Sequence, residues 1–309
     1  MIGAPSSTWF TAPPHWEWLI VLYFFIGGLA GGSYFLAALI DLLGRDEDAP
    51  LARLGYYIAF PCVVLSALLL TADLGRPLRF WHMLIESNTF RPMFKSWSPM
   101  SVGSWALLIF GLFSFVSFLA ALAEEDRVTS PGLRRFQWPA FRRFRASSSL
   151  KHVINLLGGI AGFYLAGYTG VLLAVTNRPI WSDTSLIGML FVISAASTSA
   201  ALMMLLAHRN RWTMPGIAAL QRMDGWVLVL ELLALIAAIV SLGPVIRAWL
   251  NAWGLLLLFG VILPGLLVPL AHFHGYGRFR QLSITTTAVL VLVGGLLLRV
   301  VIIFSAQSV

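Results

Sequence analysis

Long runs of apolar residues alternate with short polar segments along most of this chain. About 20 consecutive apolar residues in a helix cross the hydrocarbon core of a bilayer. Eight stretches of the 309-residue chain are long enough to do so. The pattern therefore predicts an all-α integral membrane protein with eight transmembrane helices, at approximately residues 17–43, 53–72, 101–123, 151–176, 184–207, 223–241, 252–271 and 281–304.

The eight predicted helices divide naturally into two halves of a single membrane domain, residues 1–309. Bundles of four helices are a common packing arrangement, so we expect one bundle over about 17–176 and a second over 184–304. The first run contains the cluster Gly27–Gly32, a doubled small-xxx-small pattern that lets another helix approach closely. We expect the cluster to serve tight helix packing. The functional alternative is that these glycines leave bare backbone against which the flat ring of a ligand can lie.

The composition supports a membrane protein. Hydrophobic residues make up 59% of the chain and charged residues only 11%, whereas soluble domains average about 25% charged residues. The single cysteine, Cys62, excludes an internal disulfide framework and any cysteine-ligated cluster within one copy. Residues 1–14 lack the basic region of a signal peptide, so we expect no cleavable signal there.

Basic residues are unevenly divided between the two ends of the predicted helices. The richer end carries fourteen: Arg45, Arg53, Arg127, Arg134, Arg135, Arg142, Arg143, Arg145, Lys151, Arg209, Arg211, Arg222, Arg278 and Arg280. The other end carries six: Arg76, Arg79, Arg91, Lys95, Arg178 and Arg247. By the positive-inside rule the richer end is cytoplasmic, which places both termini on the outer, periplasmic side. Orientation and anionic lipid thus explain the net charge of +8 better than nucleic acid does.

The segment from Thr71 to His82 joins the end of one apolar run to a possible short helix. Pro77 suits the first turn of a helix, because its fixed φ and missing N–H cost nothing there. In such a helix the polar residues Arg79, His82 and Glu86 share one face, and the apolar residues Leu78, Trp81, Leu84 and Ile85 lie mostly on the other. This predicts a helix lying in the membrane interface.

Asp73 ends the apolar run before this segment. A carboxylate at that depth needs a cation, and Arg76 and Arg79 are within reach to supply it. The alternative is that the whole segment is an ordinary interfacial helix with no further function.

Polar residues inside the apolar runs must find a partner or water. Glu231 lies in the middle of the sixth run, as a proton-relay carboxyl or as a structural hydrogen-bonding group. Asp41 and Asp224 are expected to be interfacial, and Arg299 to extend toward the membrane surface or to pair with a carboxylate. Hydroxyl groups in the fifth run are expected either to pack or to line a water wire: Ser194, Ser197, Thr198 and Ser199.

No redox centre can be assigned to the protein from its sequence. The six histidines, at positions 15, 82, 152, 208, 272 and 274, lie at edges or in loops, so no pair faces across the membrane to hold a haem. The sequence contains no Walker motif, no nucleophile elbow and no Cys/His cluster that would bind a metal. The protein therefore lacks the means to perform redox chemistry unaided.

Four segments together have a recognisable pattern. They are Trp16-Glu-Trp18 with the Gly27–Gly32 cluster, Asp73-Leu-Gly-Arg-Pro-Leu-Arg-Phe-Trp81, Ser98-Pro-Met-Ser-Val-Gly-Ser-Trp105, and Tyr168-Thr-Gly170 with Asn177-Arg-Pro-Ile-Trp181. With the eight predicted helices, they resemble the NrfD/PsrC family, the membrane subunits of polysulfide reductase and related respiratory complexes.

The resemblance implies a haem-free, multi-pass subunit of the bacterial inner membrane that binds menaquinone or ubiquinone near the outer face. It implies an iron–sulfur (ferredoxin-like) partner, with a molybdopterin catalytic subunit or a multihaem cytochrome. Tyr168 looks like the tyrosine that hydrogen-bonds the quinone in this family. Asp73 and Arg76 look like the family's pair of charged residues in an outer loop. Some members of the family have a histidine inside the first helix, in the quinone pocket. This sequence has none there, and His15, just before the helix, is the nearest histidine.

Under the predicted orientation these residues all lie near the outer face. We expect quinone binding by Tyr168, Asp73, Arg76, Arg79 and His15. Oxidation of a quinol releases two protons and two electrons, so it requires an acid–base group. We expect Asp73 or His82 to be this acid–base group. Glu231, in the middle of the membrane, is a hypothetical proton connection from the site to the cytoplasm.

Two other classes of function are possible. A non-redox transporter would show broken helices near the midplane, and Pro264 and Pro269 in the seventh run are the only comparable feature. A purely structural membrane anchor is the third possibility.

Overall fold

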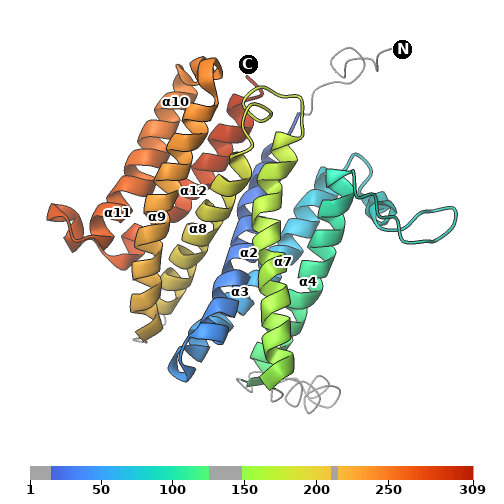
Figure 1. The fold of residues 1–309 in the computed structure, drawn as a ribbon, viewed down its shortest axis with the longest axis horizontal. Coiled ribbons are helices and arrows are strands. Elements are labelled where there is room, and N and C mark those ends of the chain that lie inside the picture. Colours follow the sequence, from blue (N-terminus) through green and yellow to red (C-terminus); the bar gives the residue numbers. More distant parts are fainter. Residues whose placement is uncertain (1–14, 125–147, 210–214, 309) are drawn as a thin grey trace.

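A computed structural model describes residues 15–124, 148–209 and 215–308 of the chain. Within these ranges the regular structure is helical, apart from one isolated β-bridge between Ile85 and Pro92. Eight of the described helical segments are long and apolar enough to cross a membrane, which confirms the predicted number. Figure 1 shows the long helices side by side with roughly aligned axes.

The elements follow the predicted order. They are α2 (Trp18–Leu43), η1 (Asp46–Asp48), α3 (Ala49–Asp73), η2 (Pro77–Met83), α4 (Pro99–Glu124), α7 (Ser148–Ala174), α8 (Ile187–Arg209), α9 (Pro215–Ser241), η3 (Gly243–Trp249), α10 (Ala252–Leu256), η4 (Leu257–Leu267), α11 (Val268–Phe273), η5 (Gly277–Gln281) and α12 (Ile284–Ser305). Helix α3 begins before the predicted boundary because Pro50 is compatible with the first turn of a helix.

Helix α2 lies at the centre of the molecule and packs against α3, α7 and α8. The glycine cluster permits this packing. A Cβ atom at Gly31 would overlap the carbonyl oxygen of Gly162 on α7, and one at Gly32 would overlap the Ser199 side chain on α8. These close approaches confirm tight helix packing as a role of the cluster.

Buried apolar side chains form more than one core. One cluster comes from α2, α3, α4 and α7, and a larger one is built mainly from α8, α9, η4 and α12 together with parts of α2 and α7. Because α2 also packs directly on α8, contacts continue across the proposed boundary. The division into two four-helix bundles therefore stays a prediction.

The first and last described residues lie at the same end of the helices. The Trp16 backbone N–H donates to the Gln307 side chain (3.1 Å), and the Gln307 amide donates to the Trp16 carbonyl (2.9 Å). Figure 1 shows the end of α3 and the start of α4 at this end too. Its assignment to the outer side stays a prediction, and the basic positions 127–145 and 211 lie outside the described residues.

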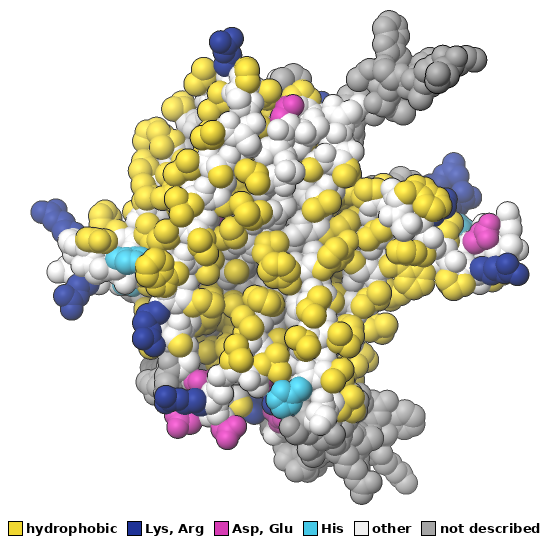
Figure 2. All heavy atoms as spheres, viewed as in Figure 1, with side chains coloured by type: hydrophobic (Ala, Val, Ile, Leu, Met, Phe, Trp, Pro, Cys, Tyr) yellow, Lys and Arg dark blue, Asp and Glu magenta, His cyan; other side chains and the backbone are white. Residues whose placement is uncertain are grey.

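The surface matches a membrane environment. In the view of Figure 2, hydrophobic side chains cover the middle of the molecule, whereas charged side chains gather toward its edges. Exposed large apolar residues are spread along α4, α7 and α9, where a bilayer would cover them. With the eight apolar helices, this surface identifies a multi-pass membrane protein.

The seventh span contains the π-helix η4, which includes Pro264. Proline removes one backbone donor and clashes with the carbonyl four residues earlier, and a π-helical register relieves that clash by shifting the hydrogen bonds. The span continues through α11, so the proline changes the local winding without breaking the helix.

Candidate functional site

A cavity of about 480 Å³ lies between α2, α3, α4, α7 and η2. Its lining is mostly apolar, and its polar groups come from Tyr23, Thr71, Asp73, Ser104 and Tyr168. Small-molecule sites have volumes of about 300–1,000 Å³ with a few polar groups. The cavity therefore has the size and character of a site for an apolar ligand.

The cavity opens between α3 and α4. The lining residues Val64, Leu108 and Phe115 are 41%, 40% and 42% exposed. They lie on the apolar surface that a bilayer would cover. A lipid-soluble molecule could thus enter from the membrane without crossing a polar surface.

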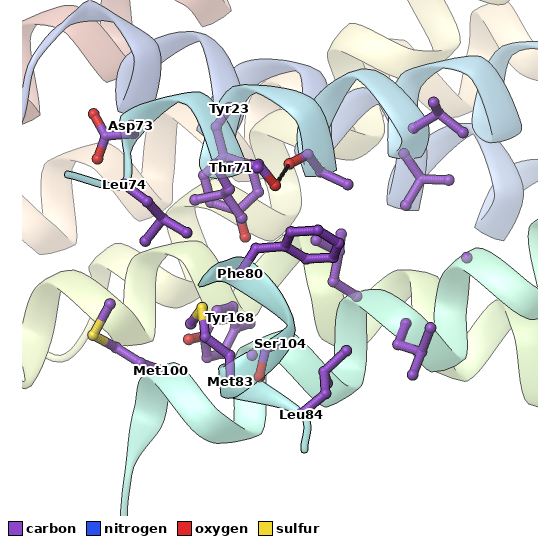
Figure 3. A pocket seen from close by; sticks show the side chains of 18 of the residues that line it. Tyr23, Thr71, Asp73, Leu74, Phe80, Met83, Leu84, Met100, Ser104 and Tyr168 are labelled. Carbon is purple, nitrogen blue, oxygen red and sulfur yellow. Dashed lines mark hydrogen bonds between the residues drawn. The ribbon is translucent and has the colours of Figure 1, made fainter. Parts of the chain in front are cut away.

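The predicted short helix does begin at Pro77, as η2, but it is a 3-10 helix. The tighter winding changes which residues share a face. Phe80, Met83 and Leu84 line the cavity (Figure 3), whereas Leu78, which we expected on the apolar face, is 90% exposed. Helix η2 closes one wall of the cavity, and its position in the membrane interface stays a prediction, because a membrane-facing Leu78 would be exposed in the same way.

Tyr168 of α7 reaches the cavity across the start of α4. Its hydroxyl donates a hydrogen bond of 2.5 Å to the backbone carbonyl of Pro99. A Cβ atom at Gly103 would overlap the tyrosine ring, so the missing side chain is what lets the ring lie there.

Tyr23 of α2 is a cavity residue that the sequence analysis did not identify. It is buried, and in Figure 3 its hydroxyl points into the cavity from the side opposite Tyr168. The two phenols are close enough to interact electrostatically. An aromatic residue in an apolar run looks like ordinary core, so no local signal distinguished Tyr23.

Asp73 lies at the rim of the cavity, where its carboxylate points away from Tyr168 (Figure 3). We expected Arg76 or Arg79 to pair with it. Among the described residues Asp73 forms no ion pair, and the carboxylate of Glu17 is close enough to interact with it electrostatically. The expected pairing is therefore wrong: Leu74 ends α3 in an extended conformation, and the backbone then carries both arginines into exposed positions.

The other predicted outer residues lie outside the cavity lining. Arg76, Arg79 and His15 are exposed. The His82 ring stacks on its neighbour Trp81, with 3.8 Å between ring centroids, and its Nδ1 is 3.2 Å from the Arg79 carbonyl oxygen. The structure thus brings Asp73 and Tyr168 together at one site and leaves the other four beside it.

A second polar cluster is buried between α8, α9 and α12. Arg299, which we expected to extend to the surface or to pair with a carboxylate, is 1% exposed, and its guanidinium donates to the Ser194 hydroxyl (2.7 Å) and the Gly295 carbonyl (2.7 Å). Glu231 is 2% exposed and lies close enough to interact electrostatically with Arg299. The extension to the surface is therefore wrong, and among the described residues Arg299 forms no ion pair with a carboxylate, although Glu231 lies nearby.

The Asp224 side chain is buried and lies well inside α9, contrary to the interfacial position that we expected. The Asp41 side chain is also buried, but it lies close to the end of α2, as expected. Neither carboxylate oxygen of Asp224 has a hydrogen-bond partner among the described residues, and its neighbours include Ser197 and Glu231. Asp41 instead pairs with Lys151 (3.3 Å) and accepts hydrogen bonds from Tyr56 and Asn155. Asp41 is satisfied structurally, whereas Asp224 extends the polar cluster around Glu231.

Eight apolar helices, four of which enclose with η2 a laterally open, mostly apolar cavity with two phenol hydroxyls, define a multi-pass membrane protein with a site for a lipophilic ligand. The family model described as "Polysulphide reductase, NrfD" matches residues 10–309, and the protein belongs to this family. This confirms the resemblance seen in the sequence and, for a bacterial protein, indicates the inner membrane.

Several relatives match over most of the sequence. A polysulfide reductase chain from Wolinella succinogenes is 27% identical over 95% of the present sequence and 94% of its own length. Protein NrfD of Escherichia coli is 26% identical over 94% of the present sequence and 95% of its own. A tetrathionate reductase subunit from Salmonella typhimurium is 27% identical over 77% of the present sequence and 64% of its own. The protein is thus related to membrane subunits of reductase complexes.

Proposed function

We propose that the protein is a haem-free subunit that binds menaquinone or ubiquinone in the cavity. It exchanges electrons between the quinone pool and an iron–sulfur partner subunit, which connects in turn to a molybdopterin or multihaem subunit. The observation that carries the proposal is the apolar cavity itself: it opens between α3 and α4 and presents the phenols of Tyr23 and Tyr168 to its interior.

The cavity suits a quinone for chemical reasons. A quinone has a flat, apolar ring with two carbonyl oxygens and a hydrophobic tail. The ring matches a wall of Phe80, Met83 and Leu84, the oxygens match the phenol groups, and the opening gives the tail a path to lipid. A few well-placed polar groups in an apolar site are what orients such a ligand.

Quinol oxidation must dispose of two protons and two electrons for each ring. Asp73 at the cavity rim is the proposed proton acceptor, since it is a carboxylate without a paired cation among the described residues. His82 is a second candidate on the adjacent η2, and Arg76, Arg79 and His15 would act at the mouth. The electrons pass to the partner, because in the proposal this subunit has no redox centre of its own.

Proton coupling across the membrane is the further part of this proposal. Helix α2 separates the cavity from the buried cluster of Glu231, Asp224 and Arg299. A Cβ atom at Gly27 would lie 3.6 Å from the Tyr23 ring, and one at the adjacent Gly28 would lie 3.4 Å from Arg299. Burying a carboxylate this deep costs free energy, and ionisable residues inside membrane spans usually have a function, which supports Glu231 as a proton-relay group.

Partner subunits are proposed from the relatives. Their names describe chains and subunits of polysulfide, tetrathionate and selenate reductases, and such enzymes contain more than their membrane component. No described feature favours the transporter alternative specifically, since the span with Pro264 remains continuous.

The test is gentle detergent extraction of the native complex, followed by mass spectrometry of the co-purifying proteins and an assay of quinol oxidation. We expect an iron–sulfur subunit, a molybdopterin or multihaem subunit, and quinol oxidation that requires them. A protein that purifies alone, and that supports substrate flux in liposomes without partners, would contradict the proposal and favour a transporter.

A further inference from the structure

The two phenols in the cavity differ in their hydrogen bonding. A phenol has one proton to donate and oxygen lone pairs to accept with. The Tyr168 proton is already used, because its hydroxyl donates to the Pro99 carbonyl at 2.5 Å. Toward a ligand in the cavity, Tyr168 is therefore left as an acceptor.

Tyr23 has the opposite character. Its side chain is 2% exposed, yet its hydroxyl forms no hydrogen bond with any residue in the part of the chain that the structure describes. Buried tyrosine hydroxyls usually find a partner, because an unsatisfied polar group inside a protein costs free energy. The hydroxyl points into the cavity (Figure 3), so a ligand there can satisfy it.

Packing holds the Tyr23 ring in this position. The ring lies beside Gly27 of its own helix and contacts Phe24, with 5.4 Å between ring centroids. The opposite face of the cavity is formed by Tyr168 and the side chains of η2. The donor of Tyr23 and the acceptor of Tyr168 thus face a common space from two helices.

Resting on the proposed quinone site, we infer that Tyr23 is the residue that donates a hydrogen bond to a carbonyl of the bound quinone, whereas Tyr168 accepts one from a hydroxyl of the quinol. Tyr23 then positions the oxidised ring and Tyr168 the reduced ring.

The test is infrared difference spectroscopy on the purified complex with decylubiquinone labelled with ¹³C at one carbonyl or the other. A hydrogen bond lowers the stretching frequency of the carbonyl that accepts it. We expect a lowered band in the wild type, its return to the free frequency in Tyr23→Phe, and a lowered band that persists in Tyr168→Phe.

Affinities provide the second readout. Loss of one hydrogen bond changes an equilibrium by roughly 3- to 12-fold. Tyr23→Phe should weaken decylubiquinone binding by about this factor, and Tyr168→Phe should instead raise the KM for the quinol. Tyr164→Phe is the matched control, because Tyr164 is an exposed tyrosine one turn before Tyr168 on α7 and lies outside the cavity lining. The control also keeps the ring that stacks on Tyr168.

Each outcome decides the inference. If the wild type binds quinone and Tyr23→Phe keeps the lowered band, or Tyr168→Phe abolishes it, the assignment is overturned while the proposed function stands. If the wild-type complex binds no quinone, both are overturned. Should Tyr23→Phe fail to assemble, Tyr23→His supplies another hydrogen-bond donor at the same position. A lowered carbonyl band together with wild-type affinity in Tyr23→His supports the inference. Loss of the lowered band in Tyr23→His overturns the inference.

Discussion

The Tyr168 ring lies so close to the backbone of Gly103 that a Cβ atom at position 103 would overlap it. The same ring is tied to the first turn of α4 by its hydrogen bond to the Pro99 carbonyl. A side chain of α7 is therefore held in place by α4, at two points one helical turn apart. The position of the Tyr168 hydroxyl in the cavity depends on this contact between the two helices.

Gly103→Ala is expected to displace the Tyr168 ring, which a Cβ atom at position 103 would overlap, and so to weaken quinol oxidation. Loss of the positioned hydroxyl should raise the KM for quinol by roughly 3- to 12-fold, because the free energy of one hydrogen bond changes an equilibrium by about that factor. Steady-state assays of the purified complex measure this change.

Ile109→Ala is the control for that variant, because Ile109 lies on the same helix, is 46% exposed on the apolar surface and is outside the cavity lining. Its KM should stay within about twofold of the wild type, as expected for a substitution at an exposed position away from the site. Equal effects from both variants would mean that the contact with Tyr168 is not the cause.

Asp73→Asn tests the proposed proton acceptor. The amide keeps the shape of the carboxylate but cannot accept a proton at neutral pH, and loss of a general base typically lowers kcat by roughly 10²- to 10⁴-fold. We expect kcat for quinol oxidation to fall by about 100-fold with little change in KM. Glu86→Gln, in the exposed segment after η2, should retain wild-type kcat; unchanged kcat in Asp73→Asn would exclude the aspartate as acceptor.

Arg299→Met tests the buried cluster in the second half of the protein. Without the guanidinium, the Glu231 carboxyl loses its nearby cation, and breaking a buried charged arrangement costs about 3 kcal/mol. The free energy of unfolding in detergent should fall by this amount, and the double variant with Glu231→Gln should recover much of it.

Arg247→Met provides the comparison for the cluster, since Arg247 is exposed on η3. A surface substitution of this kind should change the unfolding free energy by less than about 0.5 kcal/mol. If the double variant is as unstable as Arg299→Met alone, the interaction between Glu231 and Arg299 contributes nothing to folding.

The sequence was sufficient for the fold at the level of helices, because the membrane makes helix length and hydrophobicity decisive. All eight spans lie where the apolar runs placed them. The close approach of α2 to α7 was predictable from Gly31, since a small residue is what such an approach requires.

The site was only partly predictable. Asp73 and Tyr168 reach one cavity as the family pattern suggests, but the wall formed by η2 depends on 3-10 winding, which hydrophobic periodicity does not distinguish from α-helix over one or two turns. Tyr23 and Asp224 were missed or misplaced for a different reason. Whether a polar group in an apolar run meets lipid, water or a neighbouring helix depends on packing between helices, which a single run does not encode.

Photoaffinity labelling tests the central claim most directly, namely that the cavity between α2, α3, α4, α7 and η2 binds quinone. The purified complex would be irradiated with an azidoquinone, with and without excess quinone, and the labelled peptides identified by mass spectrometry. We predict labels on peptides that contain Phe80, Met83 or Met100, which line the cavity, and their loss when unlabelled quinone competes. Labelling confined to other helices, or labelling that quinone does not displace, would contradict the account.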